Sequence, residues 1–290
     1  MGTSKYDVGL LFAVLLMALP MSVVPSGDAD LFWHLKTGEQ ILRTRSLLSV
    51  DPFSFSQQGR PWLYKDVLAD LVLYAGHAAL GFGAFVVLKL LAVVAWLWAY
   101  SRALPERARE PVAILVPIAL LLLSLWLVER PNLFSMALFP VLLLQCERLL
   151  RTETTTLRAA LRSIAPVLLV LVLWAWLHRA ALLGVGLVAL LALRLSFLRA
   201  QRLRAPQVQA AWLLALLAPA LCCLTPAGVH IFQTGTAVAK SDVMRHYVSE
   251  WRRLPVGALL ATFPAAYLMA GVAGLGLLPV LRRRGPAWLD

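Results

Sequence analysis

Long apolar runs separated by short polar connections are the main pattern of this 290-residue sequence. A helix needs roughly 20 residues to cross about 30 Å of hydrocarbon, and several runs approach that length. They are continuous and rich in Leu and Ala rather than alternating in polarity, which favours helices over the strands of a membrane barrel. We predict spans near 8–25, 83–101, 111–128, 133–150, 163–178, 180–198, 207–224 and 257–281. The expected fold is an all-α, polytopic membrane helical bundle of about eight transmembrane helices.

Segment 67–80 is apolar but too short to be a ninth span. It carries Asp66 and Asp70 at its start and His77 near its end, and it runs into Gly81. We predict a juxtamembrane helix that lies partly immersed at the surface. If it crossed the membrane, every later loop would change sides.

The placement of basic residues supports this topology. With a cytoplasmic N-terminus, the inside segments hold 15 of the 27 Lys and Arg residues, as the positive-inside rule expects. These inside segments are 1–7, 102–110, 148–162, 194–206 and 282–290. The outside then has two long loops, 26–82 and 225–256, and two tight turns, 129–132 and 178–180. We predict one membrane domain over 1–290.

Composition agrees with a membrane protein and excludes a nucleic-acid partner. The chain is 60% hydrophobic and 14% charged, against about a quarter charged in soluble domains. Its net charge of +12 lies in short loops rather than in a basic stripe interleaved with aromatics. Cys146, Cys222 and Cys223 have no metal-ligand spacing and are predicted to pack. The run 8–25 leaves a signal peptide open as an alternative to a retained helix.

Two acids open the first outer loop, in the stretch Asp28-Ala29-Asp30. We predict Asp30 as the N-cap of an amphipathic helix that runs to about Arg43. Its apolar stripe would be Leu31, Leu35 and Leu42. One interpretation is an interfacial helix anchored by Trp33; the other places a carboxylate at the outer mouth of the bundle, as a general base or as a ligand for a divalent cation beside a phosphate.

Further polar groups fall in the remaining outer connections. Arg130, in the turn Glu129-Arg130-Pro131-Asn132, either snorkels to the interface or binds phosphate. His178 and Arg179 follow Trp174 and Trp176, which are typical of interfacial anchors. The other candidates for ligand binding are His34, Lys65, Asp66, Glu250 and Trp251.

The order of these motifs resembles bacterial members of the GT-C superfamily of membrane glycosyltransferases. The likeness covers most of the chain: DADLFWHLKTGEQIL, DPFSFS, RPWLYKDVLADLVLY, ERPNLFS, WAWLH, TPAGVHIF and SEWRRLP. The sequence departs from the family pattern at Lys65-Asp66, where such proteins often have His-Glu, at Arg179 after His178, and at Thr225 before Pro226.

This resemblance implies a transferase that moves a sugar from a polyprenyl-phosphate donor, with inversion, to an acceptor hydroxyl on the outer face of a bacterial inner membrane. By position, Asp28 and Asp30 match the essential acidic motif. Trp33 and His34 accompany them, and Arg130 and His178 match polar residues near the donor phosphate. No nucleotide would be required, and a divalent cation on Asp28 and Asp30 is left open.

Two other functions remain as alternatives. A shortened, non-catalytic member of the same superfamily would bind a membrane lipid or a partner membrane protein. A transporter or channel is the third, but the predicted spans carry few ionisable residues, with Lys89 as the main exception.

Overall fold

The computed structural model describes residues 18–20, 22–23, 27–62, 66–103, 127–151, 156–198 and 205–233. Over these residues the protein is helical, and the only β pairing is a bridge between Val50 and Pro61. The main helices are α2 (Asp30–Thr44), α3 (Val67–Leu80), α4 (Gly83–Ala103), α7 (Asn132–Arg151), α8 (Leu157–Leu177), α9 (Ala181–Leu198) and α10 (Pro206–Cys222), followed by the 3₁₀ turn η2 (Gly228–His230).

Four of these helices are long and apolar enough to cross a membrane: α4, α7, α8 and α9. The protein is therefore a helical membrane protein, as the sequence predicts. α10 has 17 residues and is shorter than the other spans, although it lies beside them. The predicted span 257–281, and most of 8–25 and 111–128, lie outside the described residues, so the prediction of about eight spans stays a prediction.

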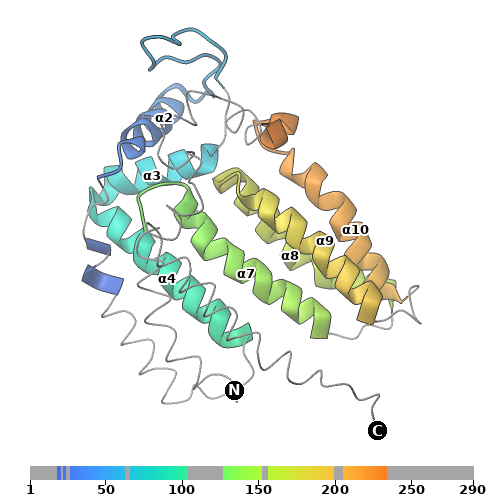
Figure 1. Cartoon of the computed structure of the whole chain (residues 1–290). Helices are drawn as coiled ribbons and strands as arrows, with labels where there is room; N and C mark the ends of the chain where they lie inside the picture. The colour runs from blue at the N-terminus through green and yellow to red at the C-terminus, as the bar shows by residue number, and fades with distance from the viewer. Residues whose placement is uncertain are drawn as a thin grey trace, which may run out of the picture.

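One end of the bundle gathers the polar connections, and we call it the rim. There α4, α7 and α9 begin, at Gly83, Asn132 and Ala181, and α8 and α10 finish, at Leu177 and Cys222. Helices α2 and α3 lie together across the rim, and α3 contacts both α4 and α8 (Figure 1). With 14 residues, or about 21 Å, α3 is too short to cross the hydrocarbon, which agrees with a surface position.

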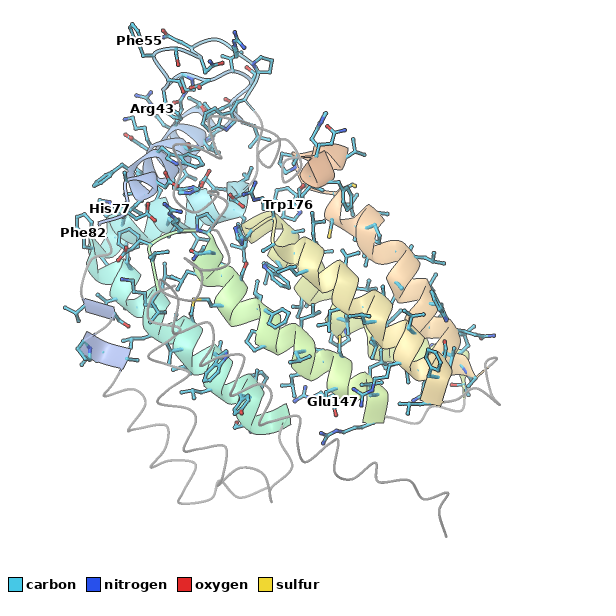
Figure 2. The ribbon with its side chains drawn as sticks, viewed as in Figure 1. Arg43, Phe55, His77, Phe82, Glu147 and Trp176 are labelled. Carbon is cyan, nitrogen blue, oxygen red and sulfur yellow. The ribbon has the colours of Figure 1, made fainter. Side chains whose placement is uncertain are left out.

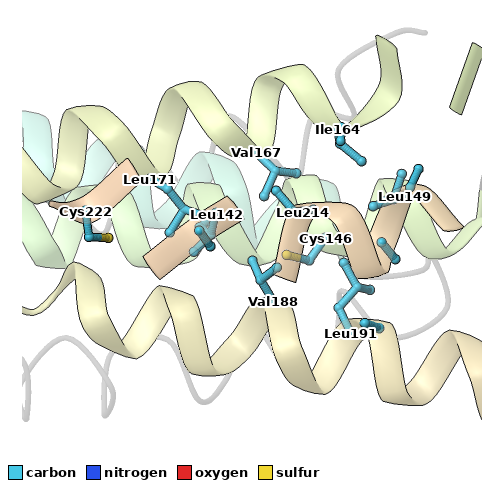
Figure 3. Close-up of a cluster of buried hydrophobic side chains, with 14 of the residues drawn as sticks. Leu142, Cys146, Leu149, Ile164, Val167, Leu171, Val188, Leu191, Leu214 and Cys222 are labelled. Carbon is cyan, nitrogen blue, oxygen red and sulfur yellow. The ribbon is translucent and has the colours of Figure 1, made fainter. Parts of the chain in front are cut away.

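The apolar core lies between α7, α8, α9 and α10. Figure 3 shows Leu142, Val167, Leu171 and Val188 converging from three of these helices. Cys146 and Cys222 are buried in the same core as free thiols, so their predicted packing role is confirmed. Gly184 allows α9 to pack closely against α7 and α8, because a Cβ built there would lie 2.6 Å from Leu171 Cδ2 and 2.8 Å from Leu142 Cδ2.

Helix α2 differs from the sequence prediction at its cap and on its buried face. Ala29, not Asp30, occupies the N-cap, and Asp30 stands in the first turn. The buried face is Leu31, His34, Thr37, Gly38 and Ile41, whereas Leu42 is 49% exposed. Packing against α3 sets this face, and apolar spacing alone could not show that a histidine, a threonine and a glycine belong to it.

The loop after α2 is ordered by its own hydrogen bonds. Asp51 Oδ1 accepts from the backbone N–H groups of Phe53 and Ser54, and Asp51 Oδ2 accepts from Ser54 Oγ at 2.5 Å. These bonds, those to Ser54 above all, hold the pKa of Asp51 below its ordinary value. Phe55 stands fully exposed at the tip, beyond α2 (Figure 2).

Candidate functional site

An arginine and two carboxylates form the centre of the polar rim. Arg130 Nη2 lies 2.8 Å from Asp28 Oδ1 and 3.1 Å from Asp30 Oδ2, and Arg130 Nε contacts Asp28 Oδ2. The guanidinium thus engages Asp28 with two nitrogens, the bidentate arrangement that arginine favours. The Asp28 side chain is 8% exposed and that of Asp30 49%, so the two acids differ in access to solvent.

Local geometry places the two acids beside each other. Gly27 has a φ of 68°, a left-handed conformation that glycine adopts without a steric penalty. The chain then turns so that Asp28 Oδ1 accepts from the Asp30 backbone N–H at 2.9 Å. Asp28 therefore accepts a backbone hydrogen bond at the start of α2, the kind of role that we predicted for Asp30.

The turn before α7 presents Arg130 to these acids. The Arg130 N–H donates to the Val128 carbonyl at 2.8 Å, and the Leu133 N–H donates to the Arg130 carbonyl at 3.0 Å. Just before it, Glu129 Oε1 pairs with Lys89 Nζ of α4 at 2.5 Å, and both residues are buried. Lys89 therefore makes an interior contact rather than reaching toward the membrane surface.

A second buried pair joins α2 to α3. His34 Nδ1 lies 2.6 Å from Asp70 Oδ1, and both side chains are 4% exposed. The Trp33 ring stacks on His34, with ring centroids 3.8 Å apart. The helices approach closely here because Gly38 has no Cβ: one built there would lie 2.2 Å from the Asp70 carbonyl oxygen.

His178 completes the rim from the end of α8. Its Nδ1 lies 2.6 Å from Ser135 Oγ of α7, which also accepts from Trp174 Nε1 at 2.7 Å. Burial, with the nearby charges of Arg179 and His34, lowers the pKa of His178 from its ordinary 6.5 to about 4. The imidazole is neutral at pH 7, so it acts by hydrogen bonding and not as a cation. Trp174 is 1% exposed and so is no interfacial anchor.

Asp66 and Arg179 link the start of α3 to the turn between α8 and α9. The Arg179 backbone N–H donates to Asp66 Oδ1 at 3.3 Å. Asp66 is buried at the start of α3. This contact brings α3 to the ends of α8 and α9, beside His178.

The structure therefore gathers most of the residues that the sequence singled out. Asp28, Asp30 and Arg130 touch directly. His34 and His178 are near enough to interact electrostatically, and Asp66 bonds to Arg179. Lys65, Glu250 and Trp251 lie outside the described residues.

Sequence reasoning missed the partners of two histidines, Asp70 and Ser135. Asp70 stands one helical turn after Asp66. The helix predicted over 67–80 therefore already implied that the two acids could lie on one face. Nothing in the sequence around Ser135 distinguished it from other serines. Lys89 and Glu129 carried a clearer signal, because an ionisable residue within a span needs a partner.

The described residues do not suit a divalent cation. Asp28 and Asp30 both ion-pair with Arg130, and no group of three or more His, Cys, Asp or Glu residues in the described part of the chain could hold a metal. Mg²⁺ can be held by one or two carboxylates when waters and a substrate phosphate complete its shell, but a cation here would first have to displace Arg130 from both acids.

An apolar cavity of about 340 Å³ lies between α4 and the start of α7, which follows the turn that carries Arg130. No charged side chain lines it. Its lining is Leu88, Leu91, Ala92, Ala95, Leu133, Phe134 and Ala137. The rim thus combines a charged cluster with a space suited to hydrocarbon.

No protein-family model matches the chain, and no curated protein or solved structure is significantly similar to it.

Proposed function

We propose that this protein is a GT-C-like membrane glycosyltransferase that moves a sugar from a polyprenyl-phosphate donor to an acceptor hydroxyl. The observation that carries the proposal is the Arg130 cluster: a guanidinium fixed on two carboxylates, one of them half exposed, beside an apolar cavity. The position of the inside arginines favours an extracytoplasmic rim in a bacterial inner membrane.

In this mechanism Asp30 is the general base, because its carboxylate is the more accessible of the two. It takes the proton of the acceptor hydroxyl as the oxygen attacks the anomeric carbon. The bond from that carbon to the phosphate oxygen breaks, and its electron pair leaves with the polyprenyl phosphate. One new glycosidic bond forms, with inversion.

Arg130 and Asp28 support this step at the departing phosphate. Arg130, 27% exposed in its side chain, would stabilise the negative charge of the departing phosphate. Asp28 holds the guanidinium in place. His178 contributes a neutral imidazole beside the site, and the cavity between α4 and α7 would take part of the lipid chain.

The test is sugar transfer from a lipid-linked donor by the full chain in reconstituted membranes. Asp30→Asn should lower kcat by about 10²–10⁴-fold, since it removes the base. Arg130→Gln should lower it by about 10²-fold or more. Glu39→Gln, an acid of the same helix that pairs at the surface with Lys36, is the matched control and should keep full activity. Wild-type turnover in Asp30→Asn would exclude Asp30 as the general base, and wild-type turnover in both Asp30→Asn and Asp28→Asn would exclude the carboxylate mechanism.

A non-catalytic membrane subunit is the second candidate, and one observation favours it. The charged residues of the rim satisfy one another: Arg130 with both acids, His34 with Asp70, and Lys89 with Glu129. Such pairing also suits a scaffold that holds a lipid or a partner protein. A folded wild type without sugar transfer, whatever donor is supplied, would favour this candidate.

A further inference from the structure

The pair between Lys89 and Glu129 is buried inside the bundle. Lys89 is 0% exposed and Glu129 4%, and their charged atoms are 2.5 Å apart. Removing two charges from water costs about as much as their attraction returns, so a buried pair of this kind adds little net stability. The pair therefore acts mainly through the geometry that it imposes.

The pair controls the turn from which Arg130 projects. Glu129 and Arg130 are consecutive, yet their side chains bind different elements, α4 for Glu129 and the start of α2 for Arg130. Hydrogen bonds from the Arg130 N–H to Val128 and from the Leu133 N–H to Arg130 tighten the backbone around them. Fixing Glu129 therefore limits the positions open to Arg130.

Apolar packing holds the residues on either side of this turn. Leu127 and Leu133 are buried in one cluster with Ala92 and Val93 of α4. Such contacts are non-directional, so they fix where the backbone lies more strongly than where its polar side chains point. The Lys89–Glu129 ion pair adds a directional link from α4 to the turn itself.

We propose that Lys89 and Glu129 are a positioning pair that holds the Arg130 guanidinium on Asp28 and Asp30. Neither residue touches the reacting groups; they act through the backbone of residues 128–131. The kinetic consequence rests on the proposed function, whereas the coupling between the two charged clusters is a property of the fold.

The kinetic test compares Lys89→Met, Glu129→Gln and the double variant, each as the full chain in lipid nanodiscs. Each single variant leaves one buried charge without its partner and should lower the Tm. The double variant removes both charges and should return the Tm to within about 2 °C of wild type. Its kcat/KM for sugar transfer should nevertheless stay about 10-fold or more below wild type, because Arg130 is no longer held in position. Recovery of turnover together with the Tm would overturn the proposal.

A second comparison measures the coupling without any activity assay. Arg130→Gln is made in the wild-type chain and in the Lys89→Met/Glu129→Gln background, and the Tm shift is compared. We expect at most half the shift in the double background, because the guanidinium there already contributes less. Shifts that agree within about 1 °C would overturn the positioning role.

The exposed pair Lys36–Glu39 on α2 supplies the control. Its charges are 2.7 Å apart but lie at the surface, so Lys36→Met/Glu39→Gln should alter neither turnover nor the effect of Arg130→Gln. If the wild type transfers no sugar, the proposed function fails, and the coupling comparison still decides the role of Lys89 and Glu129.

Discussion

Helices α8, α9 and α10 are joined by apolar side chains, whereas α2, α3 and the turn before α7 are joined by charged pairs as well as by apolar contacts. In the first region Leu171, Val188 and Leu214 pack together in one core, with Gly184 allowing close contact. In the second region a separate pair links each element to the next: Asp28 to Arg130, His34 to Asp70, and Glu129 to Lys89.

The two regions should respond differently to amino-acid substitution. A buried methyl group has many neighbours, and the loss of one contact is shared among them. A buried charge depends on one or two partners, and the loss of either leaves an uncompensated ion. The apolar region should therefore yield gradually to substitution, and the charged region abruptly.

The largest expected effect on stability is the difference between substitutions at two glycines, Gly38 and Gly184. At Gly38 an added Cβ meets the Asp70 carbonyl oxygen at 2.2 Å, and this backbone atom cannot move without displacing α3. At Gly184 the obstacles are the ends of Leu171 and Leu142 side chains, which can rotate. We expect Gly38→Ala to lower the free energy of unfolding by about 3 kcal/mol or more and Gly184→Ala by about 1–3 kcal/mol.

Gly186, on α9 like Gly184, is the matched control, because an added Cβ there meets nothing within 4 Å. Gly186→Ala should be neutral or stabilise by up to about 1 kcal/mol through helix propensity. Thermal unfolding of detergent-purified protein gives all three values. A smaller loss at Gly38 than at Gly184 would contradict the contrast between the two regions.

The next largest effect should come from Asp70, the partner of His34. Asp70→Ala leaves the buried imidazole without its acceptor and should cost about 3 kcal/mol. Asp70→Asn should cost about 1–2 kcal/mol, because the amide oxygen can still accept from Nδ1. The measurement is thermal unfolding at pH 7, and equal losses in the two variants would contradict a stabilising role for the hydrogen bond that Asn retains.

The last effect is a dependence on pH through His178. Its folded pKa is about 4 against an ordinary 6.5, so between these values the unfolded chain binds a proton that the folded chain does not. Stability is therefore complete above about pH 6.5 and declines as the pH falls toward 4, by up to about 3 kcal/mol. His178→Gln should lose this component. The difference between the Tm–pH curves of wild type and variant isolates it, and parallel curves would refute the assignment.

The four spans that the structure describes, α4, α7, α8 and α9, were predictable because length and apolar content define them. Their ends were less so: α8 begins at Leu157 rather than near 163, because Thr156 accepts from the Ala159 N–H and the helix includes Arg158 and Arg162. The hydropathy of the sequence falls at these arginines, whereas the helical backbone continues through them.

The sequence could predict at which end of the bundle the candidate residues lie, but not which of them pair. Counting spans placed Asp28, Arg130 and His178 at one end of the bundle, and the described helices do the same. The pairing of His34 with Asp70 depends on how α2 crosses α3, and the bond between Ser135 and His178 on how α7 meets α8. Separations of 36 and 43 residues carry no such angular information. Roles for Lys65, Glu250 and Trp251 stay predictions.

The ion pair between Asp28 and Arg130 has a consequence for biogenesis, because 102 residues separate its members. At a synthesis rate of about 5–20 residues per second, the ribosome adds the arginine roughly 5–20 seconds after the aspartate. During that interval α4 is made with Lys89, whose acid also comes later in the chain. The nascent protein must therefore keep these charges hydrated, or shielded by the insertion machinery, until the turn before α7 is translated.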